Sequence, residues 1–229
     1  MFTDVFGAGD ISAFLVTLKL ALLSSGILLL IAIPLAWWLA RSEWRYKFLL
    51  EAIIALPLVL PPTVLGFYLL LFLGPNGPLA PIFAWFDIRT LAFSFSGLVV
   101  ASVFYSLPFA FQPLQNSFSA IGQRPLEVAA TLGASRVDAF FSVILPLAKP
   151  GLVSAAVLSF AHTLGEFGVV LMIGGNIDGE TRVLSMAIYE HVEAGEYAQA
   201  HGLSLVLLVF SLLMLLGIYA FNKRHQVVL

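Results

Sequence analysis

Two ionisable side chains lie inside an apolar stretch of the chain that is long enough to cross a membrane. His162 and Glu166 stand four residues apart in the run His162-Thr-Leu-Gly165-Glu166-Phe-Gly168. A carboxyl group inside a bilayer costs roughly 2.5–3.5 kcal/mol on insertion scales, so Glu166 should face a cavity or a partner. At i and i+4 the two side chains would share a helix face and could form a hydrogen-bonded or ionic pair. Such a pair could hold helices together or contact a transported molecule.

The same two residues could also act as the buried acid–base pair of an integral-membrane enzyme. That chemistry would need a third polar group on another span, and no span offers an obvious nucleophile. If the chain instead moves an oxyanion, an ionised Glu166 would repel it. We therefore expect this carboxyl group to be protonated or paired, with Gly165 and Gly168 allowing close helix approach or a break.

A proline-rich run interrupts an earlier apolar stretch. Pro57, Pro61 and Pro62 fall within six residues and are followed by Thr63. Each proline removes a backbone donor and cannot continue a regular helix. Irregular backbone at membrane depth is tolerated where it is buried in protein or lines a wet cavity. The run therefore predicts either a static kink between packed helices or part of a gated transport path.

The remaining polar residues indicate little further chemistry. Lys19 is the only cation well inside an expected span, and it could reach the headgroups or face a path. Tight oxyanion binding would need a cluster of Arg or Lys, and no span carries one. The histidines lack metal-ligand spacing, and no glycine-rich phosphate loop is present, so we expect neither a metal nor a cofactor in this chain.

Composition places the chain in a membrane. Of 229 residues, 60% are hydrophobic and 10% are charged, whereas soluble domains carry about 25% charged residues. The length suits one polytopic domain over residues 1–229. The net charge of -2 argues against nucleic acid as a partner, and the chain has no cysteines.

Five segments are apolar and long enough to span a bilayer, which takes about 20 residues each. They lie near residues 11–40, 48–73, 91–112, 151–174 and 202–221. Helices are expected because lipid offers no partner to an unpaired backbone group. The predicted fold is an all-α integral membrane bundle of about five transmembrane helices.

Positive charge is concentrated on one side of these segments. That side carries Arg41, Arg45, Lys47, Arg124, Arg136, Lys149, Lys223 and Arg224, whereas the other side carries Arg89 and Arg182. Cytoplasmic loops are enriched in Lys and Arg, so the N-terminus is predicted outside the cell inner membrane and the C-terminus in the cytoplasm. The outer side is acidic and is expected to carry a short helix within residues 181–200.

The cytoplasmic loop at about 113–150 is predicted to form two compact helices. Pro125 suits a first helical position, Glu127 lies in the positive first turn, and Gly133 suits a left-handed helix stop. A second helix can begin at Ser135 and end at Pro146. Its expected apolar face consists of Val137, Phe140, Phe141 and Ile144.

This loop resembles the EAA loop of ABC importer permeases. That pattern runs Glu-Ala-Ala, three residues, Gly, nine residues, Ile-x-Leu-Pro, and here Val128 and Val143 replace one Ala and the Ile while the spacing is intact. The resemblance implies a coupling helix that sits in a cleft of a cytoplasmic ATP-binding subunit. The residues it assigns to this coupling are Arg124, Pro125, Glu127, Ala129, Ala130, Leu132, Gly133, Leu145 and Pro146.

Three further runs resemble the molybdate and sulfate branch of these permeases: PLVLPP at 57–62, GEFG at 165–168 and NIDGETR at 176–182. The resemblance implies a homodimer with two ATP-binding subunits, which hold ATP and Mg, and an extracytoplasmic oxyanion-binding protein that delivers molybdate. Tungstate, sulfate and thiosulfate remain open as cargo. A stand-alone channel would leave the cytoplasmic loop unexplained.

Overall fold

The structure, a computed structural model, describes residues 7–225, with side chains for residues 7–217, 219 and 220. Asp4 and both chain ends, on which the predicted orientation partly depends, lie outside the described residues, as do the side chains of Lys223 and Arg224. Every regular element among the described residues is a helix. The all-α prediction is therefore confirmed.

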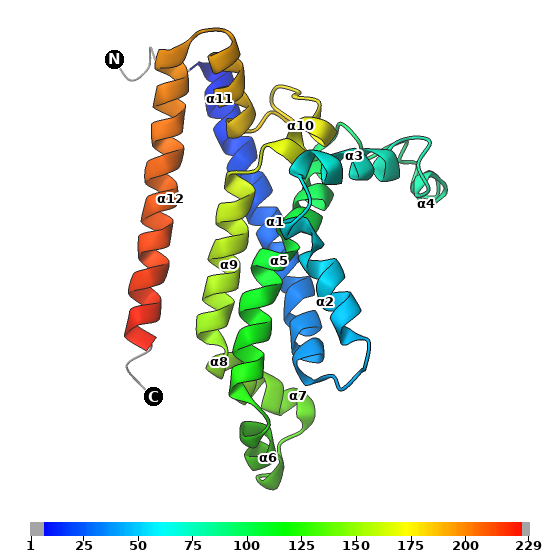
Figure 1. The fold of residues 1–229 in the computed structure, drawn as a ribbon, viewed down its shortest axis with the longest axis vertical. Helices are drawn as coiled ribbons and strands as arrows, with labels where there is room; N and C mark the ends of the chain where they lie inside the picture. Colours follow the sequence, from blue (N-terminus) through cyan, green and yellow to red (C-terminus); the bar gives the residue numbers. More distant parts are fainter. Residues whose placement is uncertain (1–6, 226–229) are drawn as a thin grey trace.

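The long helices stand side by side in a bundle (Figure 1). They are α1 (Ala8–Arg41), α5 (Phe95–Ile121), α9 (Lys149–Leu164) and α12 (Tyr197–His225). The shorter elements are α2 (Lys47–Ala55), η1 (Leu56–Leu58), α3 (Pro62–Leu73), α4 (Ala80–Ala84), α6 (Arg124–Thr131), α7 (Arg136–Ala139), η2 (Phe140–Ile144), α8 (Leu145–Leu147), α10 (Gly168–Gly174) and α11 (Leu184–Glu193).

Helices α1, α5 and α9 form the core. Leu28 and Leu39 of α1 pack with Phe111 and Phe118 of α5, and all four side chains are buried. A second cluster near the other end joins α1 and α5 to α10 through residues such as Val169. Burying large apolar side chains of this kind contributes roughly 1.5–3 kcal/mol each.

Three helices are long and apolar enough to cross a membrane alone, over Ala8–Arg41, Phe95–Ile121 and Tyr197–Gly217. Two bent helix pairs, Lys47–Leu58 with Pro62–Leu73 and Arg136–Leu147 with Lys149–Leu164, raise the number to five if each pair is one span, although the second pair includes a helix predicted for the cytoplasmic loop. The expectation of about five spans therefore agrees with the described part of the chain. α1 continues through Pro34 as one helix of 34 residues.

Two of the expected spans are not single helices. The predicted span at 48–73 turns by 109° between Lys47–Leu58 and Pro62–Leu73, so α3 runs across the bundle instead of along it (Figure 1). The three prolines remove the donors that would have continued the helix. The predicted span at 151–174 breaks after Leu164 and resumes as α10 at Gly168.

The predicted loop helices are present. Pro125 lies in the first turn of α6, Gly133 follows its end with a φ of +84°, and the Ser135 side chain accepts a hydrogen bond from the Asp138 backbone N–H at the start of α7. The second helix runs from Arg136 to Leu147, close to the predicted limits at Ser135 and Pro146, and is interrupted by the π-helical turn η2 between α7 and α8. The predicted apolar face is also partly wrong: Val137 and Phe141 are exposed, whereas Ile144 is buried.

Candidate functional site

A cavity of about 510 Å³ lies where the two chain breaks meet. Its lining is drawn from the start of α3, from α5, and from the segment joining α9 to α10. The lining residues are Pro62, Thr63, Tyr105, Ala161, His162, Gly165, Glu166, Phe167 and Gly168. Six of the eight residues predicted for a transport path thus line one cavity. The other two, Pro57 and Pro61, do not line it.

Two glycines allow α3 and α10, which follow the two chain breaks, to lie in close contact. A Cβ on Gly168 would lie 2.7 Å from the Cβ of Pro62, and a Cβ on Gly66 would lie 2.8 Å from the Cβ of Met172. Both contacts join α3 to the start or middle of α10. Helices approach this closely only where one of them carries a small residue. Gly66 was not recognised in the sequence, although a glycine inside an apolar span was the available signal.

Glu166 is almost completely buried beside this cavity, with 3% of its surface exposed. The Ser102 hydroxyl donates a 2.7 Å hydrogen bond to its Oε2, and the Ser185 hydroxyl donates to its backbone carbonyl at 2.6 Å. The other carboxyl oxygen, Oε1, is buried without a hydrogen-bond partner among the described residues. The environment of this carboxyl group is therefore polar but uncharged.

His162 makes a separate set of contacts. Its Nδ1 lies 2.8 Å from the Ser106 hydroxyl, which in turn lies 3.1 Å from the Thr163 hydroxyl. The imidazole ring stacks on Phe109 with ring centroids 3.8 Å apart. The direct pairing of His162 with Glu166, which the sequence left open, is not formed: His162 contacts Ser106 and Glu166 contacts Ser102. The physical reason is that α9 ends at Leu164, so Glu166 does not continue the helical face of His162.

Lys19 does not reach this cavity. Its Nζ lies 4.5 Å from the centroid of the Phe95 ring, as a cation–π contact on the exposed side of α1. No Lys or Arg side chain lines the cavity. The cavity can therefore offer hydrogen bonds from hydroxyl, imidazole and carboxyl groups but no net positive charge.

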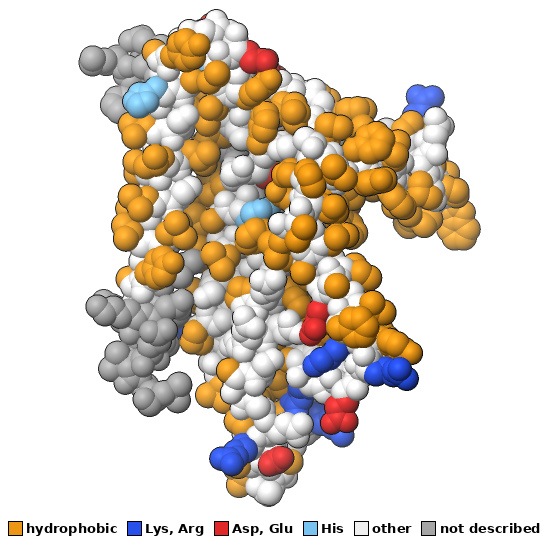
Figure 2. Space-filling model, in the orientation of Figure 1, with side chains coloured by type: hydrophobic (Ala, Val, Ile, Leu, Met, Phe, Trp, Pro, Cys, Tyr) orange, Lys and Arg blue, Asp and Glu red, His pale blue; other side chains and the backbone are white. Residues whose placement is uncertain are grey.

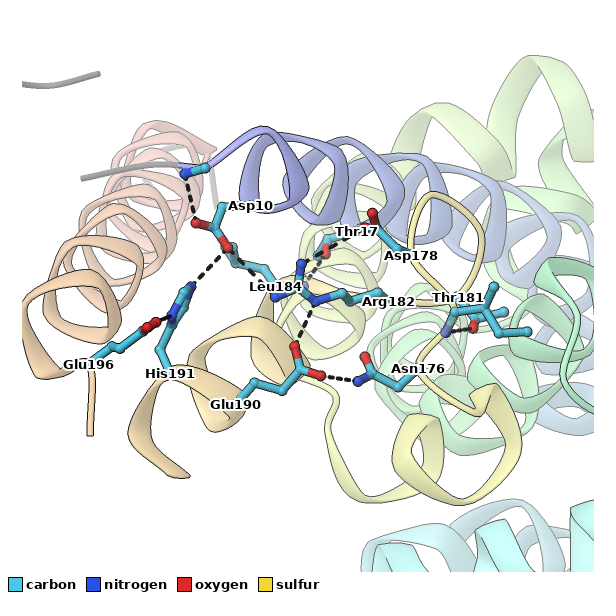
Figure 3. Close-up of polar contacts among 12 residues, drawn as sticks. Asp10, Thr17, Asn176, Asp178, Thr181, Arg182, Leu184, Glu190, His191 and Glu196 are labelled. Atoms are coloured by element: carbon cyan, nitrogen blue, oxygen red, sulfur yellow. Dashed lines mark hydrogen bonds and ion pairs between the residues drawn. The ribbon is translucent and has the colours of Figure 1, made fainter. Parts of the chain in front are cut away.

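A network of charged residues closes one end of the bundle (Figure 3). Arg182 contacts Glu190 at 2.8 Å and Asp10 at 3.8 Å, while His191 contacts Asp10 at 3.0 Å and Glu196 at 2.6 Å. The network ties α11 to the start of α1 and of α12. The sequence suggested an acidic surface and a short helix here, and it did not indicate this pairing. The described residues contain no group of three or more His, Cys, Asp or Glu suited to a metal ion.

Charged side chains gather mostly at the opposite end, around α6 and α7, while apolar side chains cover most of the face above them (Figure 2). On α6, Leu132 is 82% exposed just past the helix end and Val128 is also exposed. They line an apolar cavity of about 510 Å³, together with Arg124, Pro125, Ala129, Ala134 and Val143.

The other predicted coupling residues are distributed around this surface. Glu127 and Ala130 line a neighbouring cavity of about 480 Å³ with Arg41 and Arg136. Gly133, Leu145 and Pro146 line neither cavity. Exposed apolar groups on an otherwise charged end favour docking of a protein partner.

The sequence pattern of the family described as binding-protein-dependent transport system inner membrane component matches residues 32–226. The molybdenum transport system permease protein ModB of Azotobacter vinelandii is 58% identical over 214 residues, which are 93% of this chain and 95% of that protein. The sulfate transport system permease protein CysT of Salmonella typhimurium is 35% identical over 93% of this chain and 77% of that protein.

Among solved structures, a chain of a bacterial alginate ABC transporter in complex with an alginate pentasaccharide-bound periplasmic protein is similar. It matches with a TM-score of 0.78 at 19% identity, covering 97% of this chain and 82% of that one. At this identity the likeness shows the fold.

Proposed function

We propose that this chain is the membrane subunit of an ATP-driven importer for molybdate. The chain belongs to the family described as binding-protein-dependent transport system inner membrane component. The chain is a multi-pass inner-membrane transport subunit and not an enzyme, because its relatives are permease subunits. The observation that carries the choice of cargo is the 58% identity with the molybdenum permease over 93% of the chain. This identity is well above the 35% found with the sulfate permease.

The cavity around Glu166 and His162 is proposed as part of the translocation path. An ionised Glu166 would repel an oxyanion and would be costly at 3% exposure with one hydroxyl donor. We therefore assign it the neutral form, in which Oε2 accepts the hydrogen bond from Ser102 and the buried Oε1 carries no charge. Neutral donors hold an anion weakly. Weak holding suits a path from which the cargo must leave, with affinity residing in an extracytoplasmic oxyanion-binding protein.

Coupling to ATP is assigned to α6. Its exposed apolar tip, Leu132 and Val128, would enter a cleft of a cytoplasmic ATP-binding subunit, which holds ATP and Mg. From α6 the chain passes through α7, η2 and α8 into α9. A helix of 16 residues spans about 24 Å. Movement of α6 is thereby transmitted to the far end of α9, where His162 lies.

The complete importer is proposed to be a homodimer of this chain with two ATP-binding subunits. ATP binding would bring the two ATP-binding subunits together and draw both α6 helices inward, closing the inner gate and opening the outer one. ATP hydrolysis would then restore the inward-facing state. The family's association with binding proteins, stated in its description, supports delivery of cargo to the outer gate.

The orientation proposed from the charges places α6 in the cytoplasm and the start of the chain outside. Arg41, Arg124 and Arg136 all lie at the end formed by α6 and α7. The other side carries only Arg89 and Arg182, and the rule counts Lys and Arg residues rather than net charge. The excess of positive charge is thus on the α6 side, as the positive-inside rule requires of the cytoplasmic side.

Uptake of labelled molybdate by cells with and without this chain tests the function. We expect uptake to depend on the chain, to be blocked by excess tungstate and to be little affected by excess sulfate. Strong competition by sulfate would move the cargo to the sulfate class. Uptake that does not depend on the chain would refute the molybdate assignment.

A further inference from the structure

A second polar cavity, of about 420 Å³, lies between α2 and α5 on the α6 side of the bundle. Four polar side chains of α5 line it: Gln112, Gln115, Asn116 and Ser119. Their spacing of i, i+3, i+4 and i+7 places them on one helix face. From α2, Lys47 and Glu51 complete the polar lining.

The donors in this cavity are mostly unused. Gln115 donates a 2.6 Å hydrogen bond from Nε2 to the Glu51 Oε1. The side chains of Gln112, Asn116 and Ser119 are exposed, and none of them hydrogen-bonds to another described residue. Two amide groups and one hydroxyl therefore remain free to bind a ligand.

The position of these groups requires a polar occupant. They lie within Phe95–Ile121, a helix apolar enough to cross a membrane. Polar side chains on such a helix face a partner or a wet cavity, because lipid cannot satisfy them. Tyr105, which lines the cavity at Glu166, precedes Gln112 by seven residues, which is two helical turns. The two cavities therefore follow one face of α5.

The chemistry of the lining fits a tetrahedral oxyanion. Amide N–H groups and a hydroxyl are donors for oxyanion oxygens. The charge of Lys47 is offset by Glu51, four residues later on α2, so the cavity carries no net positive charge. Neutral donors hold an oxyanion more weakly than a basic cluster does. Weak binding next to the cytoplasmic end of the path is what release of cargo requires.

We propose that this cavity is a second oxyanion subsite, which receives the cargo after it leaves the cavity at Glu166 and before it enters the cytoplasm. This inference rests on the proposed function and adds to it a release site with named donors, Gln112, Asn116 and Ser119.

The absence of cysteine from the chain makes a direct test possible. The variants Asn116→Cys and the near-isosteric Ser119→Cys are purified with the ATP-binding subunits in lipid nanodiscs and labelled with a membrane-impermeant maleimide. Labelling of this chain is followed by mass spectrometry with and without molybdate. The matched control is Ala120→Cys, an exposed position one residue beyond Ser119 that does not line the cavity.

Both lining cysteines are expected to react, and molybdate should slow them about tenfold at roughly ten times its dissociation constant. Labelling at Ala120→Cys should not respond to molybdate. Two outcomes would overturn the inference. One is no labelling at either lining position in a complex that still binds its ATP-binding subunits, which would indicate that a second copy of the chain covers these α5 side chains. The other is labelling that molybdate does not slow.

Molybdate uptake by cells carrying the same variants separates this inference from the proposed function. If the cells import molybdate and the lining cysteines are not protected, the subsite is refuted while the importer assignment stands. If cells carrying the unmodified chain do not import molybdate, the proposed cargo itself is refuted, and the subsite for that cargo with it.

Discussion

Replacing Gly66 with alanine tests whether the tight contact between α3 and α10 holds the site together. The added Cβ would lie 2.8 Å from the Cβ of Met172 and 3.2 Å from the Cα of Val169. Reaching the shortest ordinary contact of 3.4 Å requires the two helices to separate by about 0.6 Å. Because the second neighbour is backbone, a rotamer change cannot relieve the clash. Overpacking of this kind costs about 1–3 kcal/mol.

Gly26→Ala is the matched control, since a Cβ on Gly26 of α1 meets no heavy atom within 4 Å. Removing a glycine from a helix interior stabilises by about 0.5–1 kcal/mol. Gly66 is also a helix-interior position, so both variants share this gain and should differ by the overpacking cost of about 1–3 kcal/mol, measured as thermal unfolding of the purified complex. Gly66→Ala should also reduce uptake, because α3 and α10 carry Thr63 and Gly168 of the cavity lining. Equal melting temperatures and equal uptake for the two variants would refute this account of the contact.

Three further predictions concern other parts of the chain. Glu166→Gln should keep assembly and most of the uptake, because a neutral carboxyl group and an amide have similar size and both can donate a hydrogen bond. A stable complex without uptake would show that the ionised form is needed. Gly133→Trp should leave membrane insertion intact, because the turn lies between the spans and no heavy atom lies within 4 Å of a Cβ there. It should uncouple uptake from ATP hydrolysis more than Gly133→Ala, which carries the same backbone strain at a φ of +84°; wild-type uptake in Gly133→Trp would count against the coupling role. Burial alone lowers the pKa of His191, but its hydrogen bonds to Asp10 and Glu196 and the charges of these two residues raise that pKa overall. The stabilisation from protonated His191 is therefore fully present below about pH 6.5 and is lost as the pH rises through the raised pKa. The melting temperature should accordingly fall over that interval in the unmodified chain and fall less in His191→Gln, and identical pH profiles would contradict this contribution.

Local backbone chemistry made the α6 region predictable. Proline at a first turn and glycine at a left-handed stop depend on neighbouring residues alone, so Pro125 and Gly133 located both ends of the helix. The interruption at Pro57 to Pro62 was predictable for the same reason. The size of the bend, 109°, was not, because the direction in which α3 leaves depends on its packing against α10.

The partners of buried polar groups could not be predicted in this way. A pair of His162 with Glu166 would need a continuous helix, and Gly165 and Gly168 allow either a continuous helix or a break, so the sequence did not decide between them. The actual partner of Glu166, Ser102, is 64 positions away, and Asp10 and His191 meet across 181 positions. Contacts at such separations are set by the tertiary fold. The polar side chains of Gln112, Gln115, Asn116 and Ser119 are a different case from these buried partners, because their helical spacing can be read directly from the sequence.

The helix α12 shares little of its surface with the rest of the chain. Only 11% of its apolar window is buried, and Tyr197–Gly217 would extend about 30 Å, which is the thickness of the hydrocarbon core. The described side chains of α12 do not line the cavity at Glu166, the cavity at Arg41 and Glu127, or the cavity between α2 and α5. The sequence of α12 is therefore constrained more by its length and its apolar character than by close packing against other helices of the chain. Replacing one apolar residue by another on its exposed face should therefore cost little, and an engineer could exchange most of this helix for another apolar helix of equal length.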